Sequence, residues 1–412
     1  MKIIRIIMIS VFLSLLILLS SCNGEVKHAE VNDKINQDTA LENNMPSERD
    51  VFGETRISFA AAGDNIIHEA VFTDAKNNAA VYASNTGVSA KYRFVEMFEG
   101  ISDIISSADL SYINHETPVA GDGFKISGYP DFNAPTEVGN DLAELGFDII
   151  NIANNHMLDM KEAGLRNSIA YWNEKAAESD LTIIGGYTKA DYDNVRFIEK
   201  DGVKIGLLSY VTLINDKHKN ALGASSDLLI PYANEADMTR QVGLAKEQGA
   251  DLIIVSMHWG TENEFKPNAS QKRFANHLAS LGVDVIIGTH SHTLQPIEWI
   301  EGENGHKTLC AYSLGNCLST MLYSYYMVGG ILTFDIVQDD MGETKIENPI
   351  LVPMMCHYSM TRDSLKLYTL ENYTDELVAA HGAQLNGSFT MNTLLGYVNN
   401  TIDKEFLPEY YK

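Results

Sequence analysis

The sequence predicts an α/β protein in which strands and helices form packed layers. Short apolar runs bounded by Gly, Asp or Asn alternate along the chain with longer segments whose apolar residues recur at helical spacing. In addition, polar residues of metal-binding types directly follow several of the apolar runs. Alternating elements are typical of layered α/β domains, and ligands bind such domains beyond the carboxyl ends of the strands.

The individual elements follow from these patterns. Strands are predicted at 57–63, 110–113, 147–152, 181–185, 252–257 and 283–288, with further β-structure at 309–314, 330–336 and 345–352. Helices are predicted at 94–107, 136–145, 161–178, 235–248 and 270–281. Lys200-Asp201-Gly202 separates two short runs, 195–199 and 203–210, and such a turn indicates a hairpin. The last residues, about sixty in number, show no clear pattern.

Composition limits the classes of function. The 412 residues are 45% hydrophobic and 21% charged, which is ordinary for a globular protein and excludes overall disorder. Thirty Lys and Arg against 55 Asp and Glu give a net charge of −25, which opposes binding to nucleic-acid phosphates. Four Cys are too few for a dense disulfide scaffold.

The N-terminus predicts export and a lipid anchor. Lys2 and Arg5 precede an apolar run, 6–19, that has the length of a signal-peptide core and is short for a membrane span. Leu19-Ser20-Ser21-Cys22 resembles a bacterial lipobox, in which the Cys is lipidated and becomes the mature N-terminus. An uncleaved anchor or an ordinary signal peptide is the alternative. We therefore expect a signal peptide at 1–21, lipidated Cys22, and a location on the extracytoplasmic face of the cell membrane.

A tether is predicted between this anchor and the folded body. Residues 22–55 are rich in Asn, Glu, Asp, Lys and Ser and carry too few large apolar residues to offset the entropy of ordering. Three Cys remain beyond it, and an odd number argues against a full set of disulfides. A Cys310–Cys317 bond is one alternative, and buried thiols that pack as small apolar groups are the favoured one.

Five predicted strands are each followed by a potential metal ligand. The five places are Gly63-Asp64-Asn65, Asn114-His115-Glu116, Asn154-Asn155-His156, His258-Trp259-Gly260 and Gly288-Thr289-His290-Ser291-His292. Any one of them alone is most often a turn or a surface group. Five at successive strand ends are hard to explain by turn chemistry, and we expect them to converge.

The residue types fit a centre for divalent metal ions. The candidate ligands are the carboxylates Asp64 and Glu116, the amide of Asn155, and the imidazoles His258, His290 and His292. The absence of Cys disfavours a structural zinc site, whereas mixed oxygen and nitrogen ligands suit Mn, Fe or catalytic Zn. Six ligands are many for one ion with an open position, and they suit two ions about 3.5–4 Å apart that share a carboxylate.

These motifs carry a resemblance to a known family. Gly-Asp-Asn-Ile-Ile-His, Asn-His-Glu-Thr-Pro-Val, Ala-Asn-Asn-His-Met-Leu-Asp, His-Trp-Gly-Thr-Glu, Gly-Thr-His-Ser-His-Thr-Leu-Gln-Pro and Tyr-Ser-Leu-Gly-Asn, in this order over 57–316, resemble the CapA-type poly-γ-glutamate capsule biosynthesis proteins. That family is similar in fold to calcineurin-like metallophosphoesterases. The resemblance implies a layered β-sandwich flanked by helices over 56–340, with 341–412 as a C-terminal extension packed on the same domain.

The resemblance also implies roles for single residues. The six candidate ligands would hold two ions, Glu116 would bridge them, and His156 would take the place of a general acid. One position departs from the phosphoesterase pattern, which begins Asp-x-His, because Asn65 and Ile66 follow Asp64. Either His68 or His115 substitutes for the missing imidazole, or one metal position lacks a ligand.

Four further polar residues have two interpretations each. Glu262 and Gln295 either orient the imidazoles or are surface groups. Asp159 either orients His156 or caps a helix. Asn316 either lines the site or belongs to a turn. The sequence contains no Gly-x-Ser-x-Gly element and no Walker A motif.

Taken together, the patterns predict a membrane-anchored protein of the synthesis, export or processing of poly-γ-glutamate or a related anionic envelope polymer. Its expected partners are that polymer, capsule synthesis or export proteins, and the membrane through Cys22. Two accounts of its metal site remain open. The first is a hydrolase that cleaves a phosphoester or an amide, and the second is a non-catalytic scaffold that keeps a vestigial site.

Overall fold

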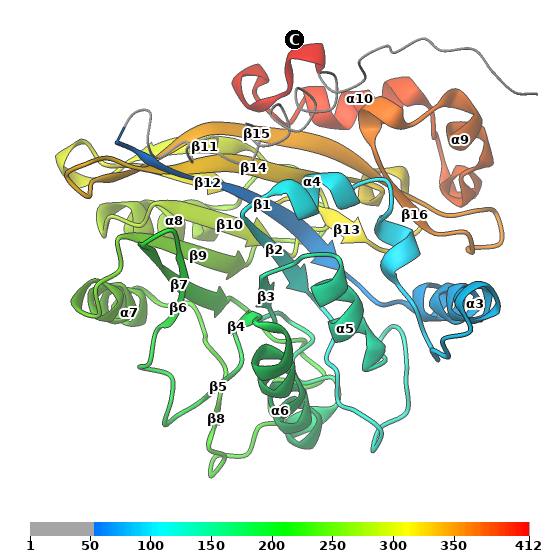
Figure 1. Cartoon of the computed structure of the whole chain (residues 1–412), viewed down its shortest axis with the longest axis horizontal. Helices are drawn as coiled ribbons and strands as arrows, with labels where there is room; N and C mark the ends of the chain where they lie inside the picture. The colour runs from blue at the N-terminus through cyan, green and yellow to red at the C-terminus, as the bar shows by residue number, and fades with distance from the viewer. Residues whose placement is uncertain (1–52, 412) are drawn as a thin grey trace, which may run out of the picture. The chain divides into compact units, whose positions relative to one another are not determined.

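The computed structural model of the protein describes residues 53–411. The predicted signal peptide, Cys22 and most of the predicted tether lie outside the described residues. Two sheets dominate the described part (Figure 1). Within it, no helix combines the length and the apolar character that a membrane crossing requires.

The first sheet has eight strands. They are β1 (Thr55–Asn65), β2 (Leu110–His115), β3 (Ile149–Asn151), β4 (Thr182–Ile184), β13 (Asn316–Leu318), β14 (Val328–Gln338), β15 (Thr344–His357) and β16 (Lys366–Thr369). Their order is β16-β15-β14-β1-β2-β3-β4, and β13 also pairs with β1. β1 to β4 run parallel, whereas β14, β15 and β16 continue the sheet in antiparallel fashion. Residues beyond 340 therefore supply two strands of the sheet that contains β1.

The second sheet has six strands in the order β11-β12-β10-β9-β7-β6. They are β6 (Arg196–Lys200), β7 (Val203–Val211), β9 (Leu252–His258), β10 (Val285–Thr289), β11 (Ile297–Glu301) and β12 (Lys307–Ala311). The four central strands are parallel, and the edge strands β6 and β11 are antiparallel to their neighbours. A small separate pair joins β5 (Tyr187–Thr188) to β8 (Leu228–Leu229).

The helices are short to medium in length. They are α3 (Glu69–Thr86), α4 (Ser102–Ser107), α5 (Glu137–Glu144), α6 (Lys161–Ser179), α7 (Glu235–Glu247), α8 (Ala269–Ser280), α9 (Asp375–Ala380) and α10 (Met391–Asn399). Short 3₁₀ helices occur at Val95–Phe98, Glu303–Gly305, Ser324–Tyr326, Leu370–Asn372, Gly382–Asn386, Lys404–Phe406 and Glu409–Tyr411.

The two sheets pack face to face, and alternation along β9 shows how. Leu252 and Ile254 belong to the core that the two sheets share, whereas Ile253 and Val255 pack with residues of α7 and α8. The Tyr112 hydroxyl of β2 lies 2.6 Å from the Ser256 hydroxyl of β9, which joins the two sheets directly. The predicted fold class, a layered β-sandwich flanked by helices, is confirmed.

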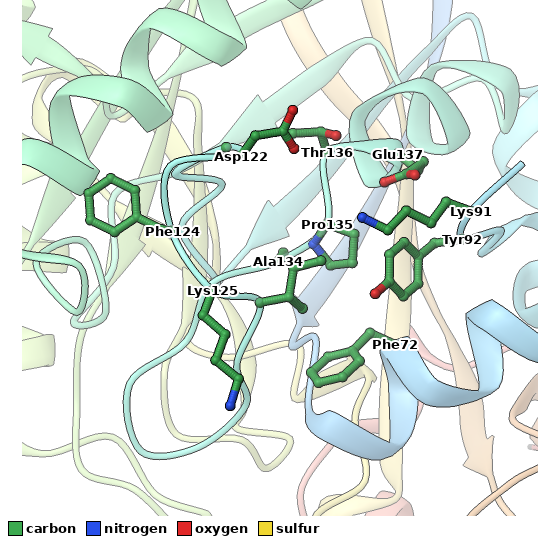
Figure 2. A pocket seen from close by; sticks show the side chains of 12 residues that line it. Phe72, Lys91, Tyr92, Asp122, Phe124, Lys125, Ala134, Pro135, Thr136 and Glu137 are labelled. Carbon is green, nitrogen blue, oxygen red and sulfur yellow. The ribbon is translucent and has the colours of Figure 1, made fainter.

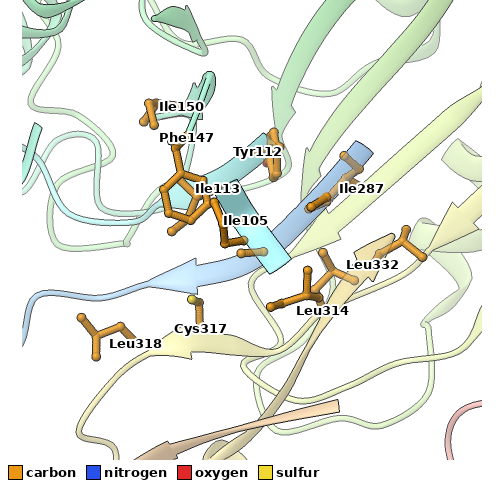
Figure 3. Packing of buried hydrophobic residues seen from close by; sticks show 14 of the residues in the cluster. Ile105, Tyr112, Ile113, Phe147, Ile150, Ile287, Leu314, Cys317, Leu318 and Leu332 are labelled. Atoms are coloured by element: carbon orange, nitrogen blue, oxygen red, sulfur yellow. The ribbon is translucent and has the colours of Figure 1, made fainter. Parts of the chain in front are cut away.

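The shared core draws on both sheets and on the helices of the first (Figure 3). Tyr112, Ile287 and Leu332 come from β2, β10 and β14 and belong to one buried cluster. Leu142 of α5 and Trp172 of α6 belong to the same cluster. Burying each side chain of this size contributes roughly 1.5–3 kcal/mol, so the strand ends are held by a rigid scaffold.

Two helical segments differ from the prediction. The single helix expected at 94–107 is wrong, because the chain forms Val95–Phe98 and α4 with Gly100 between them. Gly100 forms a bridge with Tyr368, and a Cβ there would lie 2.2 Å from the Leu367 carbonyl oxygen. Helix α3 was not predicted. Its buried face includes only small side chains such as Ala75 and Ala79 beside Val71, which leaves a weak apolar stripe.

The three cysteines of the described part are free and buried. Cys310 lies on β12, Cys317 on β13 and Cys356 on β15. The Cys356 thiol donates to the Ser319 carbonyl oxygen at 3.0 Å. The alternative of a Cys310–Cys317 bond is therefore wrong, and these thiols pack as small apolar groups.

Candidate metal centre

The strand ends of both sheets meet at one edge of the sandwich. β1 ends beside Asp64, and β2 ends at His115, directly before Glu116. In the second sheet, β9 ends at His258, whose register partner on β10 is Thr289, and His290 follows. This placement follows from parallel pairing, which puts equivalent ends of neighbouring strands side by side.

All six predicted ligands are buried and lie together. Their exposed fractions are between 0% and 4%. Asp64, Glu116 and His258 offer donor atoms within 4.8 Å of one another, and so do Glu116, His290 and His292. The Asn155 amide oxygen joins them, because it lies 2.8 Å from His258 Nε2.

Glu116 stands at the centre of this arrangement. It belongs to both groups of donors, and its Oε1 lies 3.9 Å from His258 Nε2 and 3.6 Å from His292 Nε2. Both of its carboxylate oxygens are buried and have no hydrogen-bond partner. A carboxylate that is shared by two donor groups is placed as a bridging ligand would be.

The unpartnered atoms fit bound cations. A buried polar atom without a partner costs roughly 1–3 kcal/mol, more if it is charged, so such atoms are rare. Burial, and then the charge of Asp64, raise the pKa of Glu116 well above its usual range. A divalent ion reverses this effect by favouring the carboxylate. His290 Nδ1 is also buried without a partner, which adds a nitrogen donor to the same site.

Two of the three imidazoles are held in the neutral form that metal ligation requires. Burial, and then the neighbouring imidazoles, lower the pKa of His258 well below its usual range and that of His290 to about 3. His258 Nδ1 lies 2.9 Å from the Thr289 hydroxyl oxygen, which fixes the ring and turns Nε2 towards Glu116 and Asn155. Burial lowers the pKa of His292, but Asp64, Glu262 and Asn316 together outweigh burial, and the pKa is raised above its usual value.

The loop that carries His290 and His292 has an unusual backbone. Their φ angles are 92° and 57°, in the region that residues with side chains seldom adopt. Such conformations cost about 1–3 kcal/mol each and cluster at functional sites. The result is that the two rings diverge, at an angle of 56° and a centroid distance of 6.0 Å. His292 Nδ1 lies 3.1 Å from Asp64 Oδ2 and 3.1 Å from Asn316 Oδ1.

His156 lies beside the donors but makes different contacts. Its Nδ1 is 2.7 Å from Asp159 Oδ2, and its ring packs edge-on against Phe132 at 4.8 Å. Asp159 also accepts the Phe132 backbone N–H at 2.9 Å. Of the two interpretations of Asp159, orienting His156 therefore agrees with the contacts. Asn316 likewise lines the site through its contact with His292.

Asn215 is a functional candidate that the sequence analysis missed. Its amide oxygen accepts from Asn155 Nδ2 at 2.9 Å, and its own Nδ2 lies 3.1 Å from His156 Nδ1. It thus links a predicted ligand to the predicted general acid. The available signal was its position soon after β7, a central strand of the second sheet that preceded no predicted ligand loop.

Neither alternative histidine joins the donor groups of the described part. His115 Nδ1 lies 3.1 Å from Asn65 Nδ2 and its ring packs on Trp172. His68 Nδ1 accepts the Thr320 backbone N–H at 3.3 Å. Ile66, at the position of the missing imidazole, is buried with 3% exposure. The position beside Asp64 and His292 therefore has one side-chain donor fewer than the phosphoesterase pattern implies.

Gln295 and Glu262 do not orient the imidazoles. The Gln295 side chain accepts from Gln271 at 2.7 Å and donates to the Glu264 carbonyl oxygen at 2.8 Å, which fastens a neighbouring loop. Glu262 is exposed.

A pocket of about 560 Å³ lies beside α3 and the start of α5 (Figure 2). None of the six predicted ligands lines it. Lys91 and Lys125 line it together with Asp122 and Glu137, so its charged groups balance. The pocket is therefore distinct from the metal centre and has no net preference for anions.

Comparison with known proteins agrees with this arrangement. The model of the bacterial capsule synthesis protein PGA_cap matches residues 58–321, which is more than half of the chain. The chain belongs to this family. The match includes all six predicted ligands and His156, and it ends before β14, β15 and β16.

The PGA_cap chain is also similar to capsule proteins of known name. It is 26% identical over 285 residues to the PGA biosynthesis protein CapA of Bacillus subtilis, covering 66% of this chain and 70% of that protein. It is 28% identical over 231 residues to the capsule biosynthesis protein CapA of Bacillus anthracis, covering 53% of each. The resemblance that the sequence motifs indicated is confirmed.

Among solved structures, the calcineurin-like phosphoesterase YfkN of Bacillus subtilis matches 84% of this chain and 96% of that chain. The sequence identity is 15% and the TM-score is 0.42. The NAD nucleotidase of Haemophilus influenzae matches 86% of this chain and 57% of that chain, with 13% identity and a TM-score of 0.40.

Proposed function

We propose that this PGA_cap protein is a metal-dependent hydrolase that processes poly-γ-glutamate or a related anionic envelope polymer. One observation carries the proposal, namely the buried Glu116 carboxylate, whose two oxygens lack partners and lie between two groups of ligand-type side chains. An ion at each group would give these oxygens their missing partners.

Two sets of residues would hold the ions around the shared Glu116. Asp64 and His258 form one set with it, which Asn155 joins through its contact with His258, and His290 and His292 form the other. Asp64 also contacts His292, which links the two sets. Bound ions of this type polarise the scissile group and lower the pKa of bound water to about 7.

His156 supplies the proton in this proposal. An Nδ1–H that donates to Asp159 leaves Nε2 to hold a proton and to release it to a leaving group. Phe132 packs edge-on against the ring, so the imidazole has little freedom to turn. Its burial beside the donors also excludes water from the proton that it holds.

The biological setting rests on the relatives and the N-terminus. One named Bacillus relative is a PGA biosynthesis protein and the other is a capsule biosynthesis protein, and the alignments span 70% and 53% of their lengths. We extend this to a lipoprotein on the outer face of the membrane, with capsule synthesis or export proteins as partners. Replacing Cys22 with Ser should abolish lipid labelling and move the protein to the medium or leave it unprocessed. Unchanged labelling would refute the anchor.

The metal part is tested with the mature protein. Removing metal with a chelator should lower the melting temperature, and Mn²⁺ or Zn²⁺ should restore it, because binding to the native state alone stabilises it by mass action. The metal-loaded protein should then cleave a chromogenic phosphodiester or a γ-glutamyl amide. Metal analysis that finds no bound ion, with no metal-dependent melting shift, would overturn the proposal.

A non-catalytic scaffold is the second candidate, and Ile66 favours it. This apolar side chain stands where the phosphoesterase pattern has an imidazole, and neither His68 nor His115 replaces it. A site with one weak position would bind a single ion and position a polymer without cleaving it. A protein that binds one equivalent of metal and cleaves neither substrate would support this candidate.

A further inference from the structure

Arg362 differs from every other arginine of the described part in its partners. Six of the seven arginines there form ion pairs with carboxylates, as expected in a chain with so many acidic residues. They are Arg56, Arg93, Arg166, Arg196, Arg240 and Arg273. Arg362 takes part in none of the ion pairs found in residues 53–411 and is exposed to solvent. Its guanidinium donates instead to the carbonyl and hydroxyl oxygens of Thr320.

The segment that holds Arg362 leads back to the metal centre. Thr320 lies four residues after Asn316, whose amide oxygen is 3.1 Å from His292 Nδ1. The backbone N–H of Thr320 donates to His68 Nδ1 at 3.3 Å. The His68 ring packs against Phe132 at 5.4 Å, and Phe132 packs against His156. Arg362 is thus connected to both sides of the centre, to Asn316 through four residues of chain and to His156 through the rings of His68 and Phe132.

The charges that act on His68 also indicate that Arg362 lies near the centre. Burial, and then the charges of His292, Arg362 and His156, lower the pKa of His68 to about 3. The charge of the Arg362 guanidinium therefore acts on the same imidazole as a predicted ligand and the proposed proton donor. A charge that acts on His68 from the solvent side also acts on a molecule that enters the centre from that side.

The turn around Arg362 is built to hold one conformation. Arg362 has a φ of 61°, which is unfavourable for its residue type. The Arg362 N–H donates to the Ser359 carbonyl oxygen at 2.9 Å, and the Thr361 hydroxyl donates to Asp363 at 2.9 Å. Asp74 of α3 anchors the turn by accepting the N–H of Leu365 at 2.8 Å. A turn that is fixed in this way presents a charged side chain with little loss of entropy on binding.

We propose that Arg362 binds an oxyanion of the substrate, a carboxylate or a phosphate, and so places the scissile bond over the metal centre. The inference rests on the proposed function for the role of the centre, but the anion contact itself does not require turnover. A guanidinium presents paired N–H donors that match a carboxylate or phosphate, which makes it the side chain of choice for such contacts. The residue lies beyond the part of the chain that the PGA_cap model matches.

The test uses mature metal-loaded protein and two probes, a labelled pentamer of γ-linked glutamate and inorganic phosphate. The main variant is Arg362→Asn, because Asn tolerates a positive φ and so preserves the turn. Arg362→Lys keeps the charge without the paired donors. Arg273→Gln is the matched control, since Arg273 is an exposed arginine on α8 that pairs with Glu235. Metal content and melting temperature are measured for each variant.

Arg362→Asn should weaken binding of at least one probe by roughly tenfold or more, with metal content unchanged. Arg362→Lys should lose less, and Arg273→Gln should bind as the wild type does. The difference should shrink at about 1 M salt, because salt screens an exposed charge contact. A loss confined to the glutamate pentamer assigns a carboxylate to Arg362, and a loss confined to phosphate assigns a phosphate.

The two proposals can fail separately. The anion contact would be overturned if Arg362→Asn bound both probes as tightly as the wild type does. It would also be overturned if the wild-type protein bound neither probe, whatever its metal content. A wild type without metal would overturn the proposed function, yet an Arg362-dependent affinity for the pentamer would still support the contact. An equal loss in Arg273→Gln would assign the effect to net charge and overturn the contact as well.

Discussion

Buried histidines gather in two regions of the molecule, the metal centre and the C-terminal segment. At the centre, His290 Nδ1 and both Glu116 oxygens lack partners. In the C-terminal segment, His381 Nε2 lies 3.0 Å from the Cys356 carbonyl oxygen and its Nδ1 accepts the Ala383 N–H at 2.9 Å. Nearby, His357 Nδ1 lies 2.7 Å from the Tyr373 hydroxyl.

The presence or absence of hydrogen-bond partners distinguishes a candidate binding site from a structural network of hydrogen bonds. Burial lowers the pKa of both His290 and His381 to about 3, so burial and charge state do not tell the two regions apart. The polar partners do, because a side chain whose hydrogen bonds are all made within the protein has nothing left to offer a ligand. Three predictions follow from this contrast.

The largest effect is expected at Glu116. Glu116→Gln keeps the shape of the side chain but removes the charge that both ions would share, so most bound metal and the metal-dependent rise in melting temperature should be lost. Metal analysis and thermal melting of the purified variant measure this. Glu262→Gln removes an exposed charge near the centre and should keep its metal. Full metal content in Glu116→Gln would remove the basis for a bridging role.

The second prediction separates ligands from the proposed proton donor. His290→Ala or His292→Ala should lower metal content and activity together. His156→Ala should retain metal and slow cleavage by roughly 10²–10⁴-fold, the usual contribution of general acid–base help. The loss should be smaller for a nitrophenolate, whose departure needs no proton.

If His156 only supports Asn155, His156→Ala will lose metal as readily as His290→Ala does. His381→Gln is the control from the other region and should leave metal content unchanged.

The smallest effect concerns pH and His381. Its pKa is about 3 in the folded protein and about 6.5 in the unfolded chain, so its contribution to stability is full above pH 6.5 and is lost as the pH falls towards 3. Between these values the free energy of unfolding should fall as the pH falls, because the unfolded chain binds a proton that the folded imidazole does not. Urea unfolding of wild type and His381→Gln at several pH values measures it. Parallel slopes for the two proteins would show that His381 is not held neutral.

The sequence predicted site residues where the pattern that marks them is local. A strand that ends in a polar residue can be recognised from fewer than ten positions, and parallel pairing then brings the ends together. Asp64, Glu116 and His258 were found in this way, and the structure places them in one group of donors.

Features that depend on distant partners could not be predicted. The break at Gly100 exists because β16 approaches it from more than 250 positions away. Nothing in the sequence distinguishes Asn215 from the other Asn residues, because its contacts with Asn155 and His156 appear only in the structure. Arg362 is distinguished because it forms no ion pair with a carboxylate in the described residues. The sequence does not show which arginines form ion pairs.

The position of β1 within its sheet affects how this protein can be divided. β1 carries Asp64 at its end and lies between β2 and β14. A fragment cut to the residues that the family model matches would end at 321, before β14 begins at Val328. In that fragment, one side of the strand that bears the predicted ligand Asp64 would present free backbone N–H and C=O groups along most of its length, and such an exposed strand edge promotes aggregation. We therefore expect a fragment that ends at 321 to be less soluble than one that includes β14.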